Sequence, residues 1–130
     1  LWNCYNNGLA LTEGFADFLA YWTQLDRTIA GPTVAYLGMN LESIPAGVCA
    51  NQTAEMRVAS AFWDMYDSPN DGAGIAQDVL MYVSPASSVA IYLNNNRNSM
   101  AEYLPVVQAG QSAFWQTKFA ELFRLNKIIP

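Results

Sequence analysis

Hydrophobic residues recur at helical spacing along the stretch Leu11–Trp22 and a little beyond it. Steps of three and four residues build one apolar stripe on a helix. The stripe consists of Leu11, Phe15, Phe18, Trp22, Leu25 and Ile29. This pattern predicts a helix over residues 11–28, which Gly31-Pro32 ends. Residues 1–10 are expected to form an irregular lead-in with a turn at 6–8.

Further apolar patterns predict more helices. A broad apolar arc predicts a central helix over 52–67, and shorter patterns predict helices over 74–83, 99–109 and 111–125, with a short helical stretch at 88–93. Residues 31–51 have little periodicity and are expected to form one long irregular connection, within which the short apolar run Thr33–Leu37 could be a strand. The predicted fold class is therefore all-α, a single compact domain of about five helices spanning residues 1–130.

Local signals place several helix boundaries. Ser84-Pro85 is expected to end the third helix, and Ser99 with Glu102 forms a capping-box pattern that opens the fourth. Pro105 then requires a kink or a shifted start. The last helix is expected to turn its large apolar residues toward one broad face. These residues are Phe114, Trp115, Phe119, Leu122 and Phe123.

Two carboxylates lie away from the aromatic stripe of the first predicted helix. Glu13 and Asp17 are four residues apart, which puts them one turn from each other. Ala16 and Ala20 share their side of the helix. Small residues let another helix or a metal site approach closely, whereas a plain solvent face more often carries Lys, Gln or Arg. This pair is the main candidate functional site.

The segment Glu13-Gly-Phe-Ala-Asp17 resembles the second motif helix of the gluzincin, or thermolysin-like, zinc metallopeptidases. In that family an upstream helix carries His-Glu-x-x-His, and a later helix carries Glu-x-x-x-Asp. The Glu is the third zinc ligand, and the Asp forms a hydrogen bond with a zinc-bound histidine. The resemblance implies that Glu13 is a zinc ligand and that Asp17 is the partner of a zinc-bound histidine.

The chain departs from the family pattern because it contains no histidine. The two histidine ligands and the catalytic Glu of the first motif helix are therefore absent, so this chain holds no catalytic residue of its own. The resemblance implies the C-terminal helical half of a zincin-like protein. Zinc, the half that carries His-Glu-x-x-His and a peptide substrate are expected only in the parent protein, and the isolated chain is expected to be inactive.

The segment from Arg57 to Asp67 resembles, more loosely, a segment downstream of this motif in bacterial zincin-like proteins. Arg57, Ser60, Asp64 and Asp67 fall on one narrow polar strip of the second predicted helix. One interpretation is a solvated strip. The other places Arg57 or Asp64 at the rim of the substrate cleft.

Composition narrows the possible partners. Hydrophobic residues make up 52% of the chain and charged residues only 13%, which is typical of a packed domain whose surface is partly covered by another domain or chain. The net charge is −5, and six scattered basic residues cannot track a nucleic-acid backbone. No apolar run reaches the roughly 20 residues that a membrane span needs.

Cys4 and Cys49 are the only cysteines. They are either two free buried thiols or one disulfide, and a disulfide would imply an exported protein. With the bacterial family resemblance, we expect a periplasmic, lipoprotein or secreted location. The chain lacks an initiator Met and a signal peptide, so we expect a processed or excised piece.

Other chemistry is weakly supported. Asp67, Asn70 and Asp71 could hold calcium, but 68–72 is more typical of a structural turn. Without histidine there is no Ser-His-Asp or Cys-His arrangement. Glycosidase carboxylates usually come from different elements rather than from one helix. The alternative to a peptidase lobe is a non-catalytic helical interaction module of an exported protein.

Overall fold

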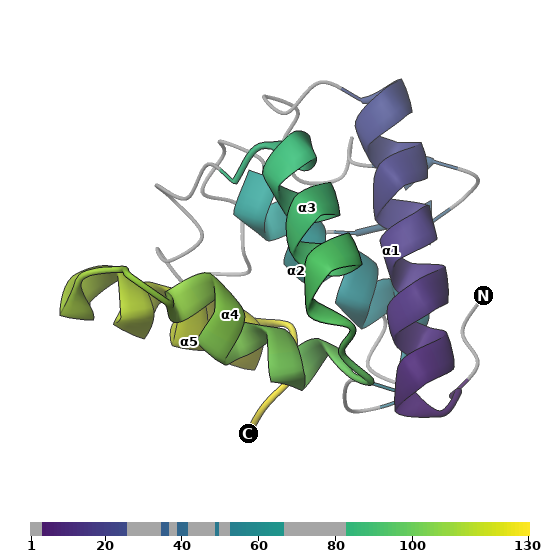
Figure 1. Cartoon of the computed structure of the whole chain (residues 1–130). Coiled ribbons are helices and arrows are strands. Elements are labelled where there is room, and N and C mark those ends of the chain that lie inside the picture. The colour runs from purple at the N-terminus through teal and green to yellow at the C-terminus, as the bar shows by residue number, and fades with distance from the viewer. Residues whose placement is uncertain (1–3, 26–34, 37–38, 42–48, 50–52, 67–82) are drawn as a thin grey trace.

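The computed structural model describes residues 4–25, 35–36, 39–41, 49, 53–66 and 83–130. Within them the fold is all-α, as predicted (Figure 1). The α-helices are α1 (Asn7–Gln24), α2 (Glu55–Tyr66), α3 (Pro85–Asn95), α4 (Leu104–Gln108) and α5 (Ala113–Leu125), and a 3₁₀ turn, η2 (Met100–Tyr103), leads into α4. The strands β1 (Ala35–Tyr36) and β2 (Met39–Asn40) pair antiparallel, with Ala35 opposite Asn40.

Helix α2 is the centre of the fold. Every residue from Glu55 to Tyr66 is buried, and α1 packs along α2 (Figure 1). Helix α3 contacts α1 through the stacked rings of Tyr92 and Phe15. Aromatic rings join these helices: Phe15 of α1 contacts Phe62 of α2 edge-on, at 5.0 Å between ring centroids. The prediction of a central second helix packed against the first is confirmed.

Helix α1 starts earlier and ends earlier than the predicted 11–28. Asn6 is its N-cap, and the Asn6 side chain accepts a hydrogen bond from the backbone N–H of Leu9. An Asx cap satisfies a donor at the helix start, so the predicted turn at 6–8 is instead the first turn of α1. Leu25 is already extended, and residues 26–34 lie outside the described residues.

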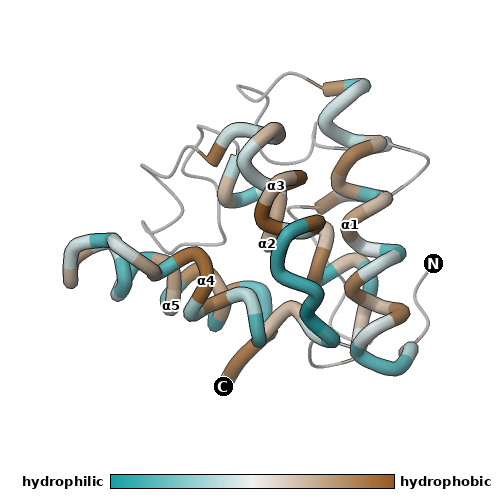
Figure 2. The backbone as a smooth tube through the Cα atoms, in the orientation of Figure 1, coloured by the Kyte–Doolittle hydropathy of each residue, from teal (hydrophilic) through white to brown (hydrophobic). Residues whose placement is uncertain are grey.

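The buried face of α1 is rotated relative to the predicted stripe. Leu11, Phe15 and Phe18 are buried as expected, but Trp22 is 39% exposed. Tyr21 is buried in its place and contacts Trp63 of α2 edge-on, at 6.4 Å between centroids. Figure 2 shows the hydrophobic and hydrophilic positions alternating along the tube of this helix.

Pro85 begins a helix rather than ending one. Ser84 caps α3, its side chain accepting from the backbone N–H of Ser87, and Pro85 occupies the first turn, where its missing N–H costs nothing. The predicted stretch 88–93 is the middle of this longer helix. Of the helix predicted over 74–83, only Val83 is described, and it is not helical.

The predicted helix over 99–109 is split into η2 and α4. Glu102 accepts from the backbone N–H of Asn98, at 3.1 Å, and Ser99 makes no side-chain cap bond, so the capping box is not formed. Pro105 lies in the first turn of α4, so of the two predicted alternatives, a kink or a shifted helix start, the structure has the shifted start. In α5, Phe119, Leu122 and Phe123 are buried, but Phe114 is 56% exposed.

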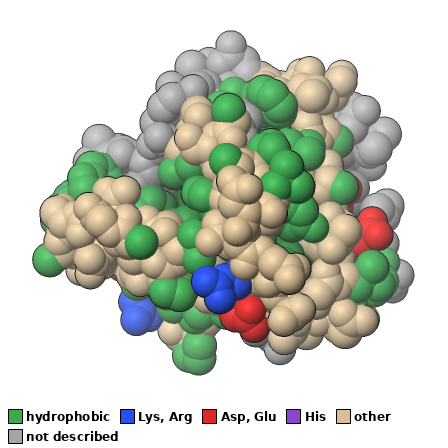
Figure 3. Space-filling view, viewed as in Figure 1, with side chains coloured by type: hydrophobic (Ala, Val, Ile, Leu, Met, Phe, Trp, Pro, Cys, Tyr) green, Lys and Arg blue, Asp and Glu red, His purple; other side chains and the backbone are tan. Residues whose placement is uncertain are grey.

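Charged side chains are sparse on the face shown in Figure 3, where hydrophobic side chains gather over α3 and the adjoining part of α1. Among the helices that the structure describes, none is both long and apolar enough to cross a bilayer. Part of the connection predicted as irregular over 31–51 is instead the antiparallel pair β1–β2, and most of the rest lies outside the described residues. The predicted turn at 68–72 and its possible calcium ligands also lie outside them.

Candidate metal-ligand site

The two acids of the motif occupy one flank of α1 and differ in their exposure. Glu13 is exposed, and Asp17, one turn later, is half-buried. Burial raises the pKa of Asp17 above its ordinary value of 3.8, and the nearby carboxylate of Glu13 raises it further. The sequence pattern predicted that Asp17 lies away from the core. Asp17 is instead half-buried, because the buried face of α1 is rotated toward it.

A third acid, Glu55, joins this pair from the first turn of α2. It is 4% exposed. Burial raises its pKa above the ordinary 4.5, and the carboxylates of Asp17 and Glu13 raise it as well. The sequence did not single out Glu55, because an acid at a helix start is expected for its favourable interaction with the helix dipole. Only the packing of α1 on α2 places it near the motif.

Gly14 explains how the two helices come so close. A Cβ built on Gly14 would overlap the backbone oxygen of Glu55 and would lie 2.6 Å from Cβ of Val58. The glycine therefore allows the backbone of α1 to contact the first turn of α2 directly.

Arg57 and Asp64 are interior residues. Arg57 is 7% exposed and Asp64 is 3% exposed, so the interpretation of a solvated strip is wrong. The Arg57 Nε donates to the backbone oxygen of Cys49 at 2.7 Å, and burial lowers the pKa of the guanidinium. Asp64 accepts a hydrogen bond from Asn126. The position of either residue at a cleft rim remains a prediction.

Cys4 and Cys49 form a disulfide, with Cα atoms 5.6 Å apart. Beside it, Cys4 makes an antiparallel bridge with Ala54, and the backbone N–H of Tyr5 donates to the oxygen of Thr53 at 2.9 Å. Of the two alternatives for the cysteines, the structure selects the bond. It ties the segments that precede α1 and α2 to each other, next to the helix that carries Glu13.

A zinc site at this motif would need more ligands than the described residues gather there. The described part of the chain gathers no group of three His, Cys, Asp or Glu side chains that could hold a metal ion, whereas a catalytic zinc site uses three protein ligands and water. The exposed carboxylate of Glu13 fits one ligand position, and its neighbour Asp17 fits a supporting acceptor. The remaining ligands of such a site would have to come from residues outside the described part.

The described part of the chain is an all-α domain whose first helix carries the exposed Glu13 and, one turn later, the half-buried Asp17. The comparisons identify the family. The family model of the mycolysin C-terminal domain matches residues 2–118, so the chain belongs to this family, which lies within the thermolysin-like metallopeptidases.

The predicted identity as a C-terminal helical half of a gluzincin-like protein is thereby confirmed at the level of the family. The family implies zinc in the parent protein. Neither the curated proteins nor the solved structures gave a significant match to this chain.

Proposed function

We propose that this chain is the C-terminal helical domain, spanning residues 1–130, of an exported bacterial zinc metallopeptidase. In the parent protein, Glu13 is the third zinc ligand and Asp17 accepts a hydrogen bond from a zinc-bound histidine. The observation that carries the proposal is the arrangement on α1. An exposed carboxylate is followed, one turn later, by a half-buried one, on a helix fixed in the core.

The division of roles follows from exposure. The exposed side chain of Glu13 is open to a metal ion held mainly by another lobe, and its carboxylate needs no reorganisation of the core. The half-buried Asp17 is more restrained, which suits a group that orients a histidine ring rather than the metal. When bound, zinc supplies Lewis acidity and lowers the pKa of a bound water.

The histidine ligands are proposed to come from a His-Glu-x-x-His helix in the N-terminal half of the parent, with a peptide as the substrate. Because this chain has no histidine, we expect the isolated chain to have no peptidase activity. The disulfide Cys4–Cys49 supports an oxidising compartment, and thus export as a periplasmic, lipoprotein or secreted protein.

The direct test uses the intact parent protein and the substitution Glu13→Gln. We expect the zinc content of the purified protein, measured by mass spectrometry of the metal, to fall with peptidase activity. Asp17→Asn is expected to weaken zinc affinity about 10- to 100-fold, as loss of a hydrogen-bond partner of a zinc ligand typically does.

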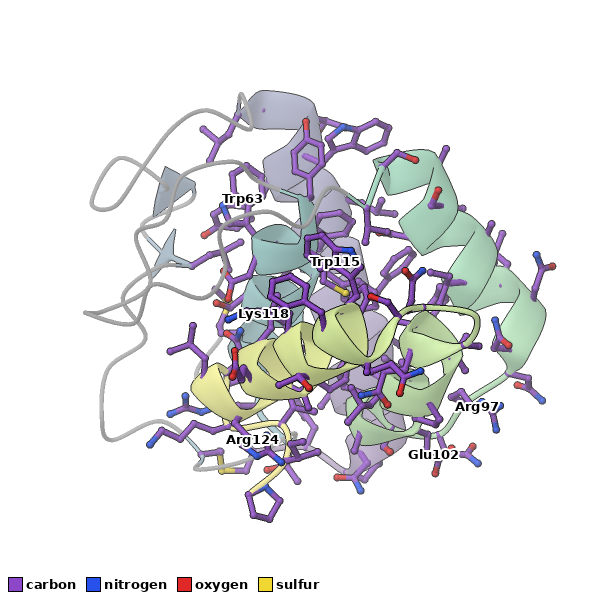
Figure 4. The ribbon with its side chains drawn as sticks, turned by 90° about the vertical axis from the view of Figure 1, so that its left-hand side faces the viewer. Trp63, Arg97, Glu102, Trp115, Lys118 and Arg124 are labelled. Carbon is purple, nitrogen blue, oxygen red and sulfur yellow. A yellow bond between two sulfur atoms is a disulfide. The ribbon has the colours of Figure 1, made fainter. Side chains whose placement is uncertain are left out.

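Glu102→Gln is the matched control. Glu102 is also exposed, and it lies near Arg97, at the junction of α3 and η2 (Figure 4). A glutamine there keeps an oxygen that can accept from Asn98, so zinc content is expected to match the unmodified parent. If Glu13→Gln behaved like Glu102→Gln, the ligand role would be lost, and the non-catalytic interaction module would be the better assignment.

A further inference from the structure

The turn of α1 that carries Glu13 is held on both sides. On one side, Gly14 lies against α2, where a Cβ would overlap the backbone oxygen of Glu55 and lie 2.6 Å from Cβ of Val58. The oxygen of Glu55 belongs to the backbone, and the Cβ of Val58 is attached directly to it. Neither atom can therefore move aside by a rotamer change.

On the other side, α3 holds the same turn through Tyr92. The ring of Tyr92 stacks on Phe15, with centroids 4.1 Å apart and planes at 7°. The Tyr92 hydroxyl also forms a hydrogen bond with Oγ1 of Thr12, at 3.3 Å. Gly14 is therefore fixed by α2, and Thr12 and Phe15 are fixed by α3. The side chain of Glu13, which lies between them in the sequence, is exposed.

We propose that Gly14 is a positioning residue, which sets the depth of α1 against α2 and thereby the place of the Glu13 carboxylate. This inference rests on the proposed zinc-ligand role of Glu13. An alanine at position 14 would need the helices to separate by about 1 Å to restore ordinary van der Waals distances. Zinc–oxygen bonds tolerate only about 0.2 Å, so such a displacement changes the coordination.

The experiment places Gly14→Ala in the intact parent protein. Zinc affinity is measured by competition with a chelator, and the coordination geometry by the visible absorption of the Co²⁺-substituted protein. We expect a dissociation constant for zinc raised about 10-fold or more and a changed Co²⁺ spectrum. A role limited to stability would shift the unfolding midpoint and leave the spectrum of the folded protein unchanged, and that result would overturn the proposal.

Gly8→Ala is the matched control on the same helix. A Cβ at Gly8 would make ordinary contacts, at 3.5 Å from Oδ1 of Asn6 and 3.6 Å from the backbone oxygen of Asn98. This variant is expected to keep the zinc dissociation constant within about twofold and the Co²⁺ spectrum unchanged. An equal effect of both glycine substitutions would also overturn the proposal.

A second pair of variants applies if Gly14→Ala does not fold. Val58→Ala alters the same contact from the α2 side, because Cγ1 of Val58 lies 2.9 Å from the Cβ position of Gly14. Val107→Ala removes the same atoms from a buried site on α4. We expect the Co²⁺ spectrum to change only in Val58→Ala, and identical spectra in the two variants would contradict the role of this contact.

Glu13→Gln, measured in parallel, separates this inference from the function on which it rests. If Glu13→Gln weakens zinc binding and Gly14→Ala does not, the positioning role is wrong and the ligand role stands. If Glu13→Gln leaves zinc binding unchanged, both are wrong.

Discussion

Asn126, just after α5, donates a hydrogen bond from Nδ2 to Oδ2 of Asp64 in α2, at 2.5 Å. The two residues are 62 positions apart in the sequence and both are buried. The same amide also donates to the backbone oxygen of Leu122, at 3.2 Å. A buried carboxylate of the central helix is thus bonded to the C-terminal end of α5.

This bond predicts a large effect for Asn126→Ala. Asp64 would lose a donor inside the core, and we expect the free energy of unfolding to fall by about 2 kcal/mol. Urea denaturation of the isolated chain measures it. Asn95→Ala is the control, because the described hydrogen bond of the Asn95 side chain goes to the backbone oxygen of Ile91 in the same helix. A loss no larger than that of Asn95→Ala would show that the Asp64 bond adds little.

The disulfide predicts a dependence of stability on redox conditions. Cys4 and Cys49 are separated by 45 positions, and opening a loop of that size is expected to lower the free energy of unfolding by about 4 kcal/mol in the chain-entropy model. Thermal unfolding with and without a reductant measures the change. The double variant Cys4→Ser with Cys49→Ser should be destabilised similarly and should not respond to reductant.

The cap of α1 predicts a smaller effect. Asn6→Ala removes the acceptor for the backbone N–H of Leu9, and we expect a loss of about 1 kcal/mol, whereas Asn6→Gly should lose only a few tenths. Asn7→Ala is the control, because Asn7 is exposed inside the first turn of α1. Equal unfolding midpoints for Asn6→Ala and Asn7→Ala would argue against the cap.

The raised pKa values of Asp17 and Glu55 predict an unusual response to pH. Since each carboxyl binds its proton more tightly in the folded chain, its contribution favours folding below its ordinary pKa of 3.8 or 4.5. That contribution is lost as the pH rises through the raised folded value. The ionised acids are thus a net cost to the isolated domain at pH 7.

Asp17→Asn tests this cost directly. We expect the variant to be more stable than the unmodified isolated chain at pH 7. The difference should shrink as the pH falls through the raised folded pKa of Asp17 toward its ordinary value of 3.8, because below both values the carboxyl is protonated in both states. Urea denaturation at several pH values measures it. If Asp17→Asn were less stable than the unmodified isolated chain at pH 7, Asp17 would stabilise its own domain. That result would weaken the proposal that Asp17 bonds to a histidine of another lobe.

The local signals of the sequence predicted where helices form better than which side of them is buried. The spacing of Leu11, Phe15 and Phe18 identified α1 and its core positions, because helical periodicity is a local property. The choice between Tyr21 and Trp22 depended on the ring of Trp63 across the interface, which no local pattern contains. Likewise, Ser84-Pro85 carries a boundary signal that is compatible with the end of one helix or the start of the next.

The candidate site divides in the same way. The spacing of Glu13 and Asp17 put them on one helix flank from the sequence alone, and the family match supports the kinship that their motif indicated. The position of Glu55 near them could not be predicted from the sequence, because it depends on the close contact between Gly14 and the backbone of α2. The burial of Arg57 and Asp64 could not be predicted from the sequence, because their hydrogen-bond partners lie outside α2. Arg57 bonds to the backbone of Cys49, and Asp64 bonds to Asn126, 62 positions away.

By itself, then, the sequence determined the all-α class, the acid pair one turn apart and the kinship of the motif, since periodicity and short spacings are set by neighbouring residues. The tertiary structure alone decided which acids share an environment, which polar residues are buried, and how close α1 lies to α2. Those features depend on contacts between residues far apart along the chain, and their free energies exist only once the helices have packed.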